Sequence, residues 1–557
     1  MSNATTEKKS AVGARSDPAV LYLSVTLAAL FVAWGVFFTD NLARVADATL
    51  GRIIENFGWL FVLAIAGFVL LAVSLALSRF GDIRLGKDHE RPEFRTASWV
   101  AMMFSAGMGI GLMFYGASEP VMHVSSPPPG TAEAGTRQAA RVALEYSYFH
   151  WAIHPWALYG VAGLVLAYFG FRKGGSNLIS CAFRPLIGDR VDGPVGKSID
   201  ILAIFATLFG SAVSLGLGAM QINSGLDAVW GIRSSTALAV SIIAVLTVLF
   251  VLSALSGVHR GIQWLSNGNM VLAGVLLAFV FVAGPTVFIL NSQTEALGGY
   301  LASLPEMSFR TGAFGGGEWL SGWTVFYWAW WISWTPFVGM FIARISRGRT
   351  IRQFIFGVIL APSLVSVVWF AVLGGTAMNQ ELHGARLSEA VATGEEAGLF
   401  ATLANLPWFP VTSVAVIILV GLFFVSGADA ASLVLATLSC RGSANPSRVV
   451  VILWGALTGL VAAVLLLAGG LEAVKQVAVI AAFPFLFVMI GMCVSLVKAL
   501  RAEPRRERSP EPAGVEEGDE QPDDKADDKP DDKADDKPGE QPAPVATGVL
   551  AGSRTDD

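Results

Sequence analysis

Four tryptophans lie within seven positions, Trp328 to Trp334, in the stretch YWAWWISWTPF at 327–337. On a helix at about 100° per residue, Trp330, Trp331 and Trp334 fall within an arc of roughly 100°. An interfacial aromatic belt would place such residues at the ends of a membrane span. These three lie about 10–14 residues into the apolar run at 320–343. Rings without a nearby acid bind quaternary ammonium groups through cation–π attraction. The stretch is therefore interpreted as a ligand-binding wall.

A second aromatic stretch, HWAIHPWALY at 150–159, contains Trp151, Trp156 and Tyr159. It also contains His150 and His154, an i,i+4 pair that would suit a metal ion. The sequence gives this pair no close acidic partner, and the whole chain has only six histidines. We therefore expect no metal here and interpret both histidines as hydrogen-bonding helix residues.

Three closely spaced glycines, Gly107, Gly109 and Gly111, interrupt the apolar run at 98–120, in SAGMGIGLMFYG at 105–116. Gly107 and Gly111 form a GxxxG pair that would suit close helix packing. Packing alone does not require Gly109, and each glycine costs a helix about 1 kcal/mol relative to alanine. The pattern predicts locally unwound backbone. At membrane depth such backbone lines a cavity or holds a ligand, with N–H groups for a carboxylate and C=O groups for sodium.

These stretches belong to an all-α membrane protein. Of 557 residues, 54% are hydrophobic and 15% are charged, with a mean hydropathy of +0.59. Apolar runs long enough to cross a ~30 Å hydrocarbon core recur along the chain. We predict twelve transmembrane helices at 20–38, 58–78, 98–120, 144–171, 198–221, 237–257, 265–291, 320–343, 353–375, 409–438, 449–470 and 474–500.

Charge predicts the orientation in the inner (plasma) membrane. With both termini cytoplasmic, the inner segments before the tail hold 20 Lys and Arg, against 8 on the outer side when Lys475 at the start of the last run is included. This is the positive-inside pattern. The scattered cysteines, Cys181, Cys440 and Cys493, indicate neither a disulfide framework nor a zinc site. No nucleophile–base pair occurs inside the spans, and we expect no enzyme activity, no organic cofactor and no nucleic-acid partner.

The two ends differ from the apolar region. We expect 1–19 to be a cytoplasmic N-terminal segment and 501–509, with four arginines, to contact anionic membrane lipids. The segment 510–557 holds 16 acidic and 5 basic residues and almost no large apolar side chains. It is predicted to be a disordered acidic tail.

The segments FSAGMGIGLMFYGASEP, HWAIHPWALY and FYWAWWISWTPFVGMFIARISRGR resemble the signatures of the betaine/choline/carnitine transporter family. The resemblance covers about 20–500. It implies two peripheral helices and a linker at 20–97, then two inverted five-helix repeats, 98–291 and 320–500, joined by an external connection at 292–319. It also implies sodium-coupled import of glycine betaine or a related methylated zwitterion by alternating access. Relatives of this kind include homotrimers.

The resemblance also implies the roles of individual residues. The ammonium cage would consist of Trp330, Trp331, Trp334, Trp151, Trp156 and Tyr159. Phe326 would gate its entrance, and the substrate carboxylate would meet the backbone at Gly107, Met108 and Gly109. Gly111 would set specificity, because choline-carrying relatives have an aspartate in place of one of these glycines.

Two sodium sites follow in the same way. One would use the hydroxyls of Thr207 and Ser211, closed by Phe337. The other would use the carbonyls of Ser105 and Met108 with Phe423 and Ser426. The family usually has two consecutive hydroxyl residues there, and this chain has Gly427 in the second position. A sodium-independent exchanger of carnitine type, choline uptake, and ectoine or dimethylsulfoniopropionate as substrates remain alternatives, as does a sensor that uses the tail.

Overall fold

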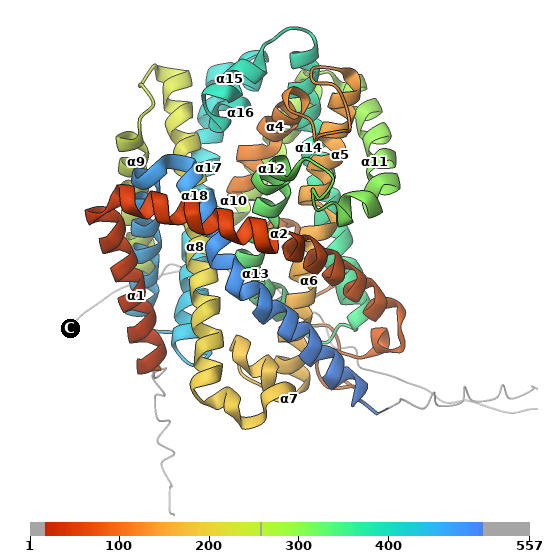
Figure 1. The fold of residues 1–557 in the computed structure, drawn as a ribbon, viewed down its shortest axis with the longest axis vertical. Coiled ribbons are helices and arrows are strands. Elements are labelled where there is room, and N and C mark those ends of the chain that lie inside the picture. Colours follow the sequence, from red (N-terminus) through yellow and green to blue (C-terminus); the bar gives the residue numbers. More distant parts are fainter. Residues whose placement is uncertain (1–16, 108, 257–258, 505–557) are drawn as a thin grey trace, which may run out of the picture. The chain divides into compact units, whose positions relative to one another are not determined.

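The computed structural model describes residues 17–107, 109–256 and 259–504. The regular structure in these ranges is helical, apart from one isolated bridge between Arg84 and Thr350 (Figure 1). Expectations for 1–16, Met108 and 505–557 lie outside the described residues, and no described contact tests the roles predicted for the Ser105 carbonyl and the Gly107 backbone. The helices are α1 (Pro18–Phe37), α2 (Thr39–Leu77), α3 (Thr96–Gly107), α4 (Ile110–Ser125), α5 (Arg137–Trp151), α6 (Ile153–Ala167), α7 (Arg184–Ile187), α8 (Pro194–Trp230), α9 (Thr236–Ser256), α10 (His259–Ala283), α11 (Thr286–Phe309), α12 (Gly317–Leu320), α13 (Phe326–Ile345), α14 (Ile351–Leu382), α15 (Leu387–Thr393), α16 (Gly398–Ala404), α17 (Phe409–Ser439) and α18 (Arg448–Arg501).

The helices confirm an all-helical chain with several potential membrane spans. In the described part of the chain, eight helices are long and apolar enough to cross a membrane. The number is nine if the bent pair Gly268–Ala283 and Thr286–Phe309 counts as one span. The twelve predicted runs do not map one to one onto these helices. The runs at 449–470 and 474–500 both lie in α18, whose backbone departs from helical geometry at Gly469 and Gly470.

The helix ends observed around 265–319 differ from those predicted. The helix predicted to extend to residue 291 ends at Ala283, and the expected external connection contains α11. Pro285 explains the break, because proline lacks an N–H donor and disfavours helical backbone at the preceding residue. The axes before and after it differ by 105°.

The aromatic helix α13 lies inside the bundle, and α2 crosses in front of it (Figure 1). Helix α13 packs against α6, α8 and α18, while α14 packs against α4 and α6. The stretches at 105–116, 150–159 and 327–337 therefore meet in one region, although more than 200 residues separate the first from the last. Four of the largest fully buried side chains are the indoles of Trp328, Trp330, Trp369 and Trp454.

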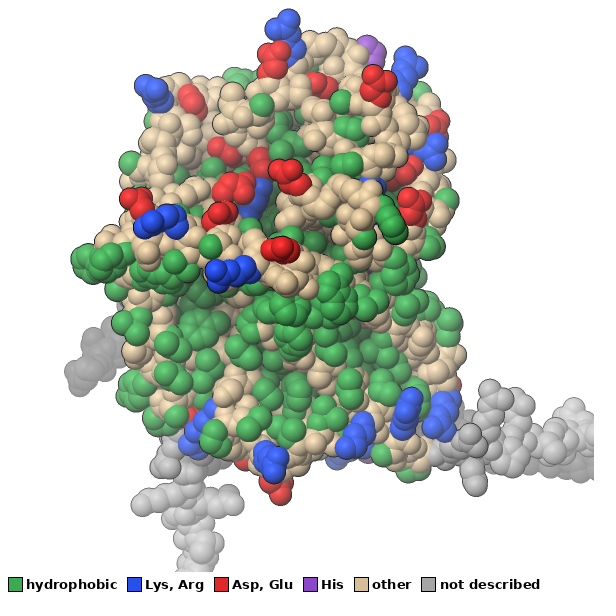
Figure 2. Space-filling view, in the orientation of Figure 1, with side chains coloured by type: hydrophobic (Ala, Val, Ile, Leu, Met, Phe, Trp, Pro, Cys, Tyr) green, Lys and Arg blue, Asp and Glu red, His purple; other side chains and the backbone are tan. Residues whose placement is uncertain are grey.

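One end of the bundle collects the basic loops. The Leu85 N–H donates to the Arg349 carbonyl at 2.8 Å, and the Asp17 N–H donates to the Ser439 carbonyl at 3.1 Å. Figure 2 shows Lys and Arg along the lower end, below a belt of hydrophobic side chains. Arg172 links two of these loops through Asp88 at 2.9 Å, and it also bonds Glu503 at 3.0 Å. The hydrogen bond from Arg172 lowers the pKa of Glu503 to about 2.

Candidate functional site

Three tryptophans of α13, Trp330, Trp331 and Trp334, form a continuous aromatic surface. Trp330 and Trp331 are stacked, with ring centroids 4.7 Å apart and an interplanar angle of 15°. Trp334 lies edge-on to Trp330 at 6.4 Å. Trp151, at the end of α5, meets Trp331 edge-on at 4.9 Å. Helical periodicity fixes the first three on one face of α13, and the packing of α13 against α6 brings the second aromatic stretch to them.

The six rings predicted to form the cage line one small cavity of about 60 Å³. Tyr159 completes it beside Trp331, with centroids 6.4 Å apart. Rings from separate helices that surround one space, with two glycines at its edge, give a site suited to a compact methylated cation. The full lining is Gly109, Gly111, Leu112, Trp151, Pro155, Trp156, Tyr159, Trp330, Trp331, Trp334, Val338 and Ser366.

The predicted interruption of the glycine-rich helix is present. Helix α3 ends at Gly107 and α4 begins at Ile110, with extended backbone at Gly109 (φ −169°, ψ −177°). The two glycines that follow the break differ in their surroundings. A Cβ atom on Gly109 would meet no other atom within 4 Å. A Cβ on Gly111 would lie 2.8 Å from the Trp151 ring and 2.9 Å from the Trp330 ring.

Phe326, the predicted gate, lies between the cage and a charged pair. The Phe326 ring stacks on the Trp330 ring, with centroids 5.7 Å apart. The Lys475 ammonium lies 5.5 Å from the centroid of the Phe326 ring. Lys475 bonds Glu395 at 2.6 Å. The Glu395 carbonyl in turn accepts from the Ser118 hydroxyl of α4 at 2.6 Å. These contacts connect the ring to the segment between α14 and α17.

The predicted sodium ligands divide into two groups. Ser211, Phe337, Phe423 and Ser426 line one cavity of about 250 Å³, together with Gly109. The lining of this cavity does not include Thr207, whose hydroxyl donates to the Ala203 carbonyl at 2.8 Å.

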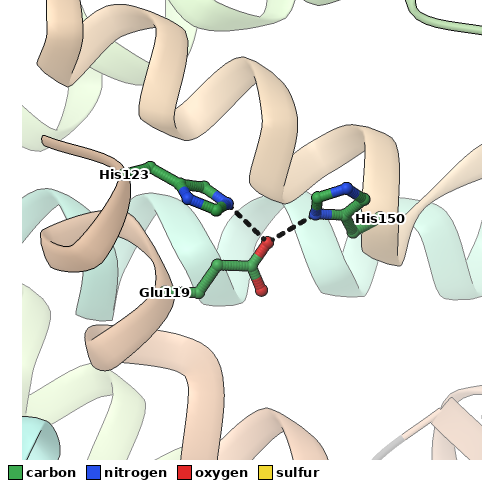
Figure 3. A group of neighbouring side chains, drawn as sticks. All are labelled: Glu119, His123 and His150. Atoms are coloured by element: carbon green, nitrogen blue, oxygen red, sulfur yellow. Dashed lines mark hydrogen bonds and ion pairs between the residues drawn. The ribbon is translucent and has the colours of Figure 1, made fainter. Parts of the chain in front are cut away.

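The sequence analysis did not identify Glu119 as a site residue. This carboxylate in α4 is fully buried, and Figure 3 shows two imidazoles directed at it. His150 Nδ1 lies 2.8 Å from Glu119 Oε1, and His123 Nε2 lies 3.3 Å from the same oxygen. The expectation that His150 has no close acidic partner was wrong. The partners lie 31 residues apart in the chain, and the packing of α4 against α5 joins them. His154 points elsewhere and bonds Ser308 at 2.9 Å.

The second oxygen of Glu119 faces the aromatic residues. Glu119 Oε2 accepts from Trp151 Nε1 at 2.7 Å and from the Tyr327 hydroxyl at 2.6 Å. The aromatic cage is therefore not free of acidic neighbours. A sequence signal existed, because a carboxylate within a predicted span is a candidate functional residue by default. One ligand atom each from Glu119, His123 and His150 lie within 4.8 Å of one another and could hold a metal ion.

A multi-helix membrane protein with an aromatic cavity beside a broken helix has the form of a secondary transporter. Residues 19–505 match the family model described as "BCCT, betaine/carnitine/choline family transporter". The chain therefore belongs to the betaine/carnitine/choline transporter family, and it is a multi-pass membrane transporter and not an enzyme.

Three relatives resemble most of the chain. The "Glycine betaine transporter OpuD" of Bacillus subtilis is 46% identical over 494 residues, covering 88% of this chain and 96% of the relative. The "Probable glycine betaine transporter" of Desulfitobacterium hafniense is 45% identical over 488 residues, with coverages of 87% and 97%. The "Ectoine/hydroxyectoine transporter" of Virgibacillus pantothenticus is 40% identical over 494 residues, with coverages of 88% and 98%.

Proposed function

We propose that this transporter imports glycine betaine or a closely related methylated zwitterion together with sodium. The observation that carries the proposal is the cavity lined by six aromatic side chains next to extended backbone at Gly109. The rings would hold the trimethylammonium group. The N–H groups of the broken helix would receive the carboxylate. The glycine betaine transporters at 45–46% identity support the same substrate.

Sodium would bind in the larger cavity next to the cage. Ser211 and Ser426 offer hydroxyl oxygens there, and Gly109 and Trp334 line both cavities. A cation bound between α8, α13 and α17 would therefore be in contact with the substrate site. Alternating access would tilt the unit made by α3 and α4, α5 and α6, α13, and α14 against the remaining helices. The packing of α13 against α6, and of α14 against α4 and α6, supports movement as one unit.

The membrane topology that fits this function has twelve crossings with both termini cytoplasmic. It adds three crossings to the nine above, namely α3 with α4, α13, and the second half of α18 beyond Gly470. Four parts of the chain lie at the basic end of the bundle, namely Asp17, 79–97, 344–352 and Glu503. The positive-inside pattern would place this end in the cytoplasm. Single cysteines introduced at 130 and at 88 should react with an impermeant maleimide only from outside and only from inside, respectively.

The function is tested with purified protein in proteoliposomes. Radiolabelled glycine betaine should accumulate when an inward sodium gradient is imposed and should not accumulate when potassium replaces sodium. Exchange with preloaded betaine that is equally fast without sodium would favour the alternative, a sodium-independent exchanger of carnitine type. Ectoine, which is named in the substrate of one relative at 40% identity, should be compared as a competitor.

A further inference from the structure

Glu119 connects to three of the rings around the candidate substrate cavity. Its Oε2 atom accepts directly from Trp151 and from Tyr327. Both rings contact Trp331: Trp151 edge-on at 4.9 Å, and Tyr327 stacked at 5.7 Å with an interplanar angle of 17°. His150, which contacts Oε1, accepts from Trp331 Nε1 through its carbonyl at 3.0 Å. The Glu119 carboxylate thus fixes the positions of the Trp151 and Tyr327 rings from the side away from the cavity.

The groups around Glu119 orient it without supplying a fixed positive charge. Its ion-pair partners among the described residues are His123 and His150. The other ring nitrogen of His150 lies 3.0 Å from the Thr324 hydroxyl, which fixes the plane of that imidazole. Glu119, His150 and Tyr327 are fully buried. Four side chains replace water around the carboxylate, and buried charge is retained in proteins when it is hydrogen-bonded in this way.

A carboxylate at this place would attract the cation that the cage is proposed to bind. The indole of Trp151 lies between Glu119 and the cavity, because its N–H bonds the carboxylate and its ring lines the space. An ammonium group in the cavity would be attracted to the face of the Trp151 ring and also to the negative charge of Glu119 behind that ring, so the two attractions add. In surroundings poor in water, the low dielectric constant keeps the attraction between the carboxylate and the ammonium group strong over several ångströms.

We propose that Glu119 is a positioning residue that fixes Trp151 and Tyr327 and makes the cage selective for a cationic headgroup. The inference rests on the proposed function, since it concerns recognition of a quaternary ammonium group. It adds a residue outside the cavity lining, and it assigns selectivity for charge to that residue rather than to the rings alone.

The test compares glycine betaine with 3,3-dimethylbutyrate, in which an uncharged tert-butyl group replaces the trimethylammonium group. Binding is measured by tryptophan fluorescence on the purified full chain, in wild type and in Glu119→Gln. The variant keeps the shape of the side chain and removes its charge. Betaine should bind about tenfold more weakly to the variant, while 3,3-dimethylbutyrate should bind no more weakly than to wild type. The affinity ratio of the two ligands should therefore fall by about tenfold.

Glu145→Gln is the matched control. Glu145 is also a buried carboxylate and lies in α5, which packs against α4. Its side chain bonds Arg141 at 2.9 Å and does not line the cavity. That variant should keep the wild-type ratio. Equal weakening of both ligands in Glu119→Gln would mean that the residue only supports structure, and an unchanged ratio would overturn the inference. A wild type that binds no betaine would overturn the proposed function and the inference with it.

If Glu119→Gln is not recovered as a folded protein, Tyr327→Phe tests the positioning role instead. It removes one of the bonds to Glu119 and leaves the charge in place. It should weaken both ligands by a similar factor of about threefold. Wild-type affinity for betaine in Tyr327→Phe would contradict the positioning role.

Discussion

A single methyl group at Gly111 should disturb the cage. The Gly111→Ala Cβ would lie 2.8 Å from Trp151 and 2.9 Å from Trp330, whereas carbon atoms in ordinary contact are about 3.5–4.0 Å apart. Each ring would have to move by about 0.6–1.2 Å. Neither is free to do so, because Trp151 donates to Glu119 at 2.7 Å and Trp330 stacks on Trp331 at 4.7 Å.

The magnitude follows from the cost of overpacking. Forcing an extra carbon into a well-packed site costs about 1–3 kcal/mol. Alanine in place of glycine in α4 returns up to ~1 kcal/mol of helix stability, so the variant should fold. That gain is present with and without ligand and does not improve binding. Displaced rings should therefore weaken betaine binding by about 5- to 150-fold, at 1.4 kcal/mol per factor of ten.

Gly67→Ala is the control, since the same methyl group there meets no atom within 4 Å and Gly67 lies in α2, outside the linings of both cavities. Its dissociation constant for betaine should stay within about twofold of wild type. Both variants are compared by tryptophan fluorescence titration and by uptake at matched protein levels. If Gly111→Ala binds as tightly as wild type, or if both variants lose affinity equally, the described ring positions do not form the binding site.

Three further results are expected. Trp331→Leu should weaken betaine binding by about 5- to 30-fold in the same titration, because it removes ~1–2 kcal/mol of desolvated cation–π attraction, and near-normal uptake would contradict the cage. Ser211→Ala should raise the sodium concentration for half-maximal uptake more than Thr207→Ala does, because only Ser211 lines the larger cavity; equal effects would contradict this difference. Because Arg172 lowers the pKa of Glu503 to about 2, from an ordinary value of 4.5, this ion pair stabilises the fold above about pH 4.5, and the contribution is lost as pH falls towards 2. Glu503→Gln should lower the thermal unfolding midpoint at pH 7 and flatten its decline between pH 5 and 3, and an unchanged midpoint would show that the ion pair contributes nothing.

The aromatic cavity could be anticipated from local patterns. The turn of a helix alone places Trp330, Trp331 and Trp334 on one face, and closely spaced glycines explain the break before Ile110. These features depend on a few residues that are neighbours in the sequence, so they can be predicted without knowing how the helices pack. The Pro285 break was equally local and could have been recognised from the proline.

The role of Glu119 could not be obtained in that way. Its hydrogen bonds reach α5 and α13 from α4, at separations of 31, 32 and 208 residues. Which side chains meet across three helices depends on their relative rotation and depth, and no local pattern encodes these. The same limit applies to Thr207, whose hydroxyl points to its own helix backbone and not into the cavity beside Ser211.

Glu119 also changes the argument about substrate choice. Without an acid near the cage, a zwitterion would be favoured over choline simply because it brings no net charge into the protein. If the Glu119 carboxylate is the one charged group beside the cage, betaine leaves the site with one negative charge, and one sodium ion restores neutrality. Choline balances the same carboxylate without sodium. Since buried net charge is costly, betaine binding should require sodium, whereas choline, if it binds, should do so equally in sodium and potassium. Equilibrium titrations of both ligands in the two salts test this, and betaine binding of equal strength in both would contradict the charge balance.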